Sequence, residues 1–76
     1  MEFIDQLSLK ETEFFKCLEN VDPESLWGLA ISNVVKKPDV SKFRSLVCDL
    51  KSQANDCAEV MQDVLGKQCF DNLLSL

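Results

Sequence analysis

Residues 40–66, VSKFRSLVCDLKSQANDCAEVMQDVLG, carry the pattern that most restricts how this chain can fold. If Val40 is taken as the first position of a seven-residue repeat, every first and fourth position up to Val64 is apolar. This spacing places the apolar side chains on one helix face and polar side chains on the other. We therefore predict one long amphipathic helix over 39–65, with coiled-coil-like spacing. Its apolar seam consists of Val40, Phe43, Val47, Leu50, Ala54, Cys57, Met61 and Val64.

The apolar stripe of this helix is wider than a two-stranded coiled coil needs. Leu46, Ala58, Val60 and Leu65 flank the seam, which indicates packing against two or more helices. The weak point is the stretch SQAND, which has low helix propensity and could divide the helix in two. After Gly66 a short last helix is expected over residues 68–75.

A second helix is expected between the two prolines. Asp22 is placed as its N-cap and Pro23 as its first helical residue, a position that proline tolerates well. A pair of lysines precedes Pro38, which cannot continue a helix. These signals predict a helix over residues 23–36.

The first segment has apolar residues at helical spacing over residues 2–20. Ser8 and Glu11 match a capping box, so a fresh helix beginning at Leu9 is the alternative to one continuous helix. No segment alternates with period two, so strands are not expected.

Together these segments predict an all-α fold with one domain over residues 1–76. We expect a small bundle of three to four helices. A chain of 76 residues buries only about 60% of the surface that it exposes when unfolded. A protein partner or self-association would therefore add to its stability. The expected helices are about 2–20, 23–36, 39–65 and 68–75.

The charge is acidic and unevenly distributed. The formal net charge is −5, and the first 24 residues hold seven acidic and two basic side chains. Such a chain lacks the basic surface that binding to nucleic acid or an anionic membrane needs. The middle of the chain is basic, and it either meets an acidic surface or is a solvated face at a helix junction. Its basic residues are Lys36, Lys37, Lys42, Arg44 and Lys51.

The chain start and the cysteines indicate a soluble, cytoplasmic protein. MEFIDQLSLKETEFF lacks the basic and uninterrupted apolar regions of a secretion signal or anchor. The four cysteines form no C-x-x-C pair and there is no histidine, so neither disulfides nor a zinc site is expected. Cys17, Cys57 and Cys69 are expected to act as small apolar residues. Cys48 falls on the polar side of the long helix and is the candidate reactive thiol.

Enzymatic activity is not predicted. Without His, Tyr or a glycine-rich phosphate loop, acid–base or nucleophilic chemistry would rest on Asp, Glu, Cys and Lys alone. No catalytic residue, metal or cofactor is therefore expected.

Two stretches resemble known families. PESLWGL resembles the attachment motif of acyl carrier proteins, which implies phosphopantetheine on Ser25. The alternative is that Ser25 is a first-turn residue with a local backbone hydrogen bond. Residues 26–76, with a helix, the turn KKPDVSKF and a long helix, are similar in layout to type III secretion needle subunits and their small helical co-chaperones. That resemblance implies a short protein that works by helix pairing.

The sequence thus favours a non-catalytic protein–protein interaction module that uses apolar helix faces. It would be an adaptor, an inhibitor or a self-assembling subunit, with a homo-oligomer or a protein partner. A distinct alternative is a small acidic inhibitor of the phage or viral type, which would use its negative first third against a basic host protein. The candidate partner-binding residues are Phe14, Phe15, Trp27, Phe43, Phe70, Leu73 and Leu74.

Overall fold

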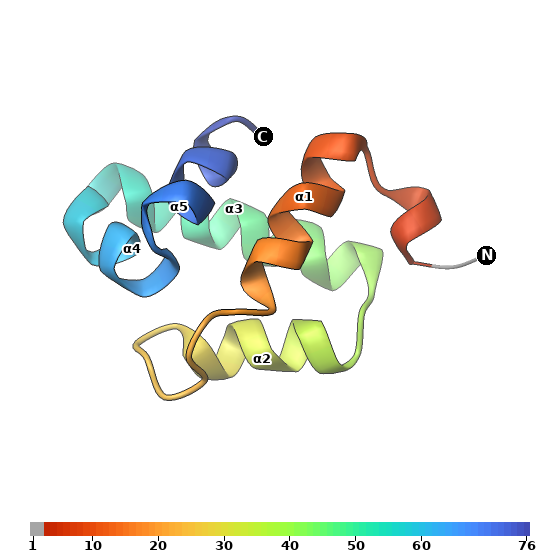
Figure 1. Cartoon of the computed structure of the whole chain (residues 1–76), viewed down its shortest axis with the longest axis horizontal. Coiled ribbons are helices and arrows are strands. Elements are labelled where there is room, and N and C mark those ends of the chain that lie inside the picture. The colour runs from red at the N-terminus through yellow and green to blue at the C-terminus, as the bar shows by residue number, and fades with distance from the viewer. Residues whose placement is uncertain (1–2) are drawn as a thin grey trace.

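The computed structural model describes residues 3–76, and this part of the chain is all-helical (Figure 1). A short 3-10 helix, η1 (Ile4–Gln6), precedes five α-helices. The predicted helical class is confirmed, but the described residues form more helices than the three to four expected. The α-helices are α1 (Leu9–Leu18), α2 (Gly28–Lys36), α3 (Val40–Asp56), α4 (Ala58–Leu65) and α5 (Lys67–Leu74).

The first segment breaks at Ser8, as the capping-box alternative predicted. The amide of Glu11 donates to Ser8 Oγ at 3.2 Å, and the amide of Ser8 donates to Glu11 Oε1 at 2.9 Å. These reciprocal bonds satisfy two backbone donors at the start of α1. A continuous helix over 2–20 is therefore wrong for the described residues.

The second helix begins at Gly28, five residues later than predicted. Asp22 does accept a capping bond, because the Glu24 amide donates to Asp22 Oδ1 at 2.9 Å. The chain then continues as two successive turns, in which the Ser25 amide donates to the Asp22 carbonyl and the Gly28 amide to the Ser25 carbonyl. Asp22 and Pro23 therefore begin a turn rather than the predicted helix 23–36.

The predicted long helix over 39–65 is also wrong, because the chain breaks at Cys57. Cys57 has φ −153° and ψ 87°, which is extended backbone between α3 and α4. The break falls one residue after SQAND, the predicted weak point. Gly66, with φ +84°, then turns the chain into α5, which lies within one residue of its predicted range. The break lets α5 fold back against α1, on the same side of α3 (Figure 1).

The core is one cluster of apolar side chains to which all five α-helices contribute. At one end, the ring of Phe43 lies 5.8 Å from that of Phe3, 6.3 Å from that of Phe14 and 5.8 Å from that of Phe15. Phe43 and Phe14 are completely buried. The core residues are Phe14, Phe15, Leu18, Ile31, Val34, Phe43, Leu46, Leu50, Ala54, Met61, Leu65, Cys69, Phe70 and Leu73.

Candidate interaction surface

Most of the predicted partner-binding residues lie in the core. Phe14, Phe15, Phe43, Phe70 and Leu73 are all buried. Trp27 is half-buried against the core, and Leu74 is 56% exposed. The five buried residues hold the fold together. Contact with a partner stays a prediction for all seven residues. Trp27 and Leu74 could make such a contact without a rearrangement of the fold, whereas the buried five could not.

The most exposed large apolar side chains are three leucines that sequence reasoning did not select. Leu9 is 77% exposed, Leu26 75% and Leu29 71%. Leu26 lies in the turn that precedes α2 and Leu29 in the first turn of the helix, only three residues apart. A helix beginning at Pro23 would have placed these leucines within a regular apolar stripe. The turn signal of Asp22 and Pro23 could have identified Leu26 as a turn residue instead.

The turns over residues 22–27 hold Leu26 in its exposed position. Four hydrogen bonds close them, including one in which Ser25 Oγ donates to the Asp22 carbonyl at 2.7 Å. This is the local backbone bond expected as the alternative to a carrier-type Ser25. Gly28 is buried, and a Cβ there would lie 2.3 Å from the Asp22 carbonyl oxygen. Only glycine permits this close approach of backbone to backbone.

One face of α2 continues from these leucines to the end of the helix. Within α2, Leu29, Asn33 and Lys36 follow one another at intervals of three or four residues and are all exposed, and the exposed Leu26 precedes them in the turn. Ile31 and Val34 point the other way into the core. We call this exposed set, together with the acidic residues of the preceding turns, the α2 outer face; it consists of Asp22, Glu24, Leu26, Leu29, Ala30, Asn33, Lys36 and Lys37.

The two ends of the α2 outer face carry opposite charges. Asp22 and Glu24 are exposed in the turns that precede the helix, and Lys36 and Lys37 are exposed where the helix ends. Between these two pairs the chain has no charged residue. Figure 1 shows α2 along one edge of the molecule, with the turns over 22–27 protruding beyond it. The face therefore has an acidic end, an apolar and uncharged middle, and a basic end.

Two shallow hollows adjoin this face where α2 meets α3. They have volumes of about 330 and 480 Å³ and share Asn33, Val34 and Lys42 in their walls. The smaller one is bordered by Lys36 and Lys37, and its remaining walls carry no acidic residue. Lys42 thus extends the basic end of α2 toward α3.

Cys48 lies in a separate cleft of about 430 Å³ between α1, α3 and the last residues of the chain. It is exposed, as its position on the polar helix side predicted. Two cations of this cleft already have partners: Arg44 Nε lies 3.1 Å from Glu11 Oε2, and Lys51 Nζ donates to the Leu76 carbonyl. The guanidinium of Arg44 and the bond from the Ser8 amide hold the pKa of the Glu11 carboxyl below its usual value. Arg44 and Lys51 thus make contacts within the chain at this cleft. The reactivity of Cys48 stays a prediction.

The other cysteines lie within or beside the apolar core. Cys69 is buried, whereas Cys17 and Cys57 are half-buried. Burial raises the pKa of the Cys69 thiol, and the neighbouring Cys17 thiol raises it further. A thiol held in its protonated form is a poor nucleophile. Cys69 thus behaves as a packing residue, as the sequence suggested.

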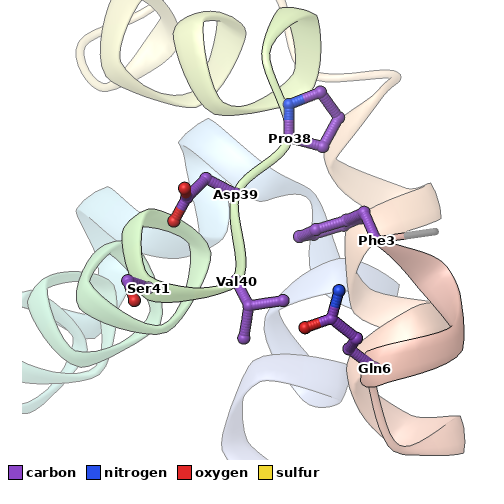
Figure 2. A pocket seen from close by; sticks show the side chains of 6 residues that line it. All are labelled: Phe3, Gln6, Pro38, Asp39, Val40 and Ser41. Atoms are coloured by element: carbon purple, nitrogen blue, oxygen red, sulfur yellow. The ribbon is translucent and has the colours of Figure 1, made fainter. Parts of the chain in front are cut away.

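Figure 2 shows the hollow between η1 and the turn that joins α2 to α3. It measures about 330 Å³ and is lined by Phe3, Gln6, Pro38, Asp39, Val40 and Ser41. Phe3 and Gln6 point toward Val40 from the opposite wall (Figure 2). Asp39, the one titratable residue among the described residues of the lining, accepts a hydrogen bond from the Lys42 amide at 3.1 Å and caps α3. Within residues 3–76, the hollow therefore separates two packed elements and brings no reactive groups together.

No protein-family model, curated protein or solved structure matches this chain. Among residues 3–76, no cluster of three or more potential metal-ligating side chains occurs. No helix in the same part of the chain is long and apolar enough to cross a membrane. The features of this surface that point to a function are the exposed leucines and the charged ends of α2.

Proposed function

We propose that this chain is a non-catalytic protein-interaction module that docks through Leu26 and Leu29. The observation that carries the proposal is the exposure of both leucines, at 75% and 71%, on a hydrogen-bonded turn and the helix that follows it. Neighbouring exposed apolar groups on a hydrogen-bonded backbone are typical of binding surfaces. The four free cysteines suit a reducing compartment such as the cytoplasm.

The energetic contribution of these leucines is sufficient to influence binding. Fully burying a leucine side chain stabilises by about 1.5–3 kcal/mol. Because Leu26 is 75% and Leu29 71% exposed, covering what remains of both would contribute roughly 2–4 kcal/mol. Because hydrogen bonds already close the turns over 22–27, less backbone conformational entropy should be lost when a partner binds. Neighbouring polar and charged residues would then form the rim of the interface and contribute specificity.

The test compares proteins that co-purify with the tagged chain and with its Leu26→Ser/Leu29→Ser variant. Since both residues are exposed, the variant should fold normally, which its circular dichroism spectrum and thermal unfolding will check. With the double variant, at least one co-purifying protein, which can be an untagged copy of this chain, should be recovered at about one tenth of the wild-type level or less. A tenfold drop corresponds to a loss of about 1.4 kcal/mol in binding free energy.

The matched control is Leu9→Ser, which replaces an equally exposed leucine on α1. Recovery of the same protein should be unchanged in this control. If wild-type and double-variant chains recover the same proteins in the same amounts, Leu26 and Leu29 do not form the binding surface and the proposal is wrong.

A further inference from the structure

We infer that the partner of the α2 outer face is a second copy of this chain, with two α2 helices packed antiparallel across a twofold axis. The inference rests on the proposed function, because it names the occupant of the same leucine surface. It is carried by the distribution of charge along α2. Asp22 and Glu24 lie at one end, and Lys36 and Lys37 at the other.

An antiparallel arrangement brings opposite charges together at both ends. If a second α2 lies alongside the first in reverse direction, the acidic turn of each copy meets Lys36 and Lys37 of its partner. The twofold axis makes this contact occur twice, so one complementary surface satisfies both chains. A parallel arrangement would instead place acid against acid and lysine against lysine, which is unfavourable.

The middle of the face suits close approach of two helices. Ala30 and Asn33 are small or short side chains, and both are exposed near the centre of the α2 outer face. Leu29 would pack beside them, against the partner's helix. Small residues at a helix contact allow the two backbones to approach closely, while the leucines supply apolar area.

The charge balance of this face also sets it apart from the rest of the molecule. Asp22 and Glu24 offset Lys36 and Lys37, so the net charge of −5 resides on the other residues. Two copies should repel each other when most other surfaces meet, but not when the α2 outer faces meet. Because α2 has only nine residues, about 13 Å of helix, the interface is small and the dimer should be weak.

The test measures molar mass by sedimentation velocity from micromolar to millimolar concentration, with reductant present to prevent disulfides through Cys48. The mass should rise with concentration from that of one 8.6 kDa chain to that of two chains and then stop. Glu24→Lys and Lys36→Glu should each raise the dissociation constant about tenfold or more, because each places like charges at both ends of the interface. Lys67→Glu, which reverses an exposed charge on α5, should leave it unchanged.

Mixing the two charge-reversed variants provides the decisive measurement. In the mixed dimer, Lys at position 24 of one chain faces Glu at position 36 of the other, while the unchanged Glu24 and Lys36 form the second contact. The equimolar mixture should therefore regain the wild-type dissociation constant although each variant alone has lost it. This rescue also excludes misfolding as the cause of the loss.

The remaining outcomes would overturn the inference. Growth beyond two chains would mean a head-to-tail arrangement, and a dimer insensitive to both charge reversals would use another surface. A monomer at every concentration would exclude self-association. In that case, a different protein whose recovery depends on Leu26 and Leu29 would leave the proposed function standing, and identical recovery with the double variant would remove both.

Discussion

The aromatic end of the core and the α2 outer face use apolar side chains in opposite ways. Phe43 is completely buried among three other phenylalanine rings, whereas Leu26 and Leu29 are more than two-thirds exposed. Both regions carry apolar residues at helical spacing, so hydrophobicity alone does not distinguish them. For Leu26 the difference comes from the backbone, because the turns over 22–27 delay the start of α2 and leave Leu26 outside it. Leu29 lies within α2, on the face that does not bury Ile31 and Val34 in the core.

The largest effect is expected at the aromatic end. Phe43→Ala should lower the free energy of unfolding by about 3–5 kcal/mol, since it removes a buried ring and leaves a cavity. Leu29→Ala, on the exposed side of the comparison, should change it by no more than about 0.5 kcal/mol. Urea unfolding followed by circular dichroism measures both. Equal losses in the two variants would show that Leu29 also supports the fold.

A smaller loss is expected where the turns meet α2. Gly28→Ala should lower the free energy of unfolding by about 1–3 kcal/mol, because the new Cβ would overlap the Asp22 carbonyl oxygen and force the turn apart. The backbone NMR chemical shifts of residues 22–29 should also change in Gly28→Ala.

Gly66→Ala is the informative control for this prediction. A Cβ at Gly66 meets no atom within 4 Å, so its cost arises from the positive φ of +84° alone. Its shifts should change around the turn between α4 and α5 and leave residues 22–29 unaffected. If Gly28→Ala is as stable as wild type with unchanged shifts, the close approach that fixes the turn does not exist.

The capping box at α1 should contribute less to the free energy of unfolding than the Phe43 ring or the close packing at Gly28. Ser8→Ala removes the hydroxyl that accepts from the Glu11 amide and should cost about 1 kcal/mol. Ser45→Ala, at an exposed position within α3, serves as the control and should be close to neutral. Thermal unfolding of the three proteins measures the difference, and a loss in Ser45→Ala equal to that in Ser8→Ala would contradict the capping role.

The smallest effect concerns the Glu11 carboxylate. Because its pKa is lowered by Arg44 and by the Ser8 amide, its charge stabilises the folded chain fully above the unfolded-state pKa. That stabilisation should be lost as the pH falls through the lower, folded-state pKa. Glu11→Gln keeps a side-chain acceptor, so its stability deficit should be present at neutral pH and vanish in acid. If the stability deficit of Glu11→Gln does not change with pH, the deficit comes from the capping hydrogen bond and not from the charge of Glu11.

Local sequence signals predicted the elements whose structure depends on near neighbours. The Ser8 and Glu11 capping box and the turn at Gly66 before the short last helix depend on residues close together in the chain, and the exposed position of Cys48 follows from the helical spacing around it. The candidate surface could not be predicted in the same way. Asp22 and Pro23 are equally suited to a helix start and to a turn, and the deciding contact is the packing of Gly28 on the Asp22 carbonyl.

The heptad pattern did not reveal the break at Cys57, for a related reason. Cys57 occupies a regular seam position, and apolar residues continue at the same spacing on both sides of it. A seven-residue repeat therefore looks the same whether the helix is continuous or bent. The bend becomes favourable when α5 packs against α1, a contact between residues far apart in the chain.

The contact between α1 and α5 has a consequence for synthesis of the chain. Phe14, Phe15 and Leu18 on the first α-helix share one core with Phe70 and Leu73 on the last. During translation α1 therefore emerges before the residues that will cover it. Its apolar side chains stay exposed until residue 73 has left the ribosome. Chaperone engagement of the nascent chain should accordingly persist until Phe70 and Leu73 have emerged and cease when α5 docks.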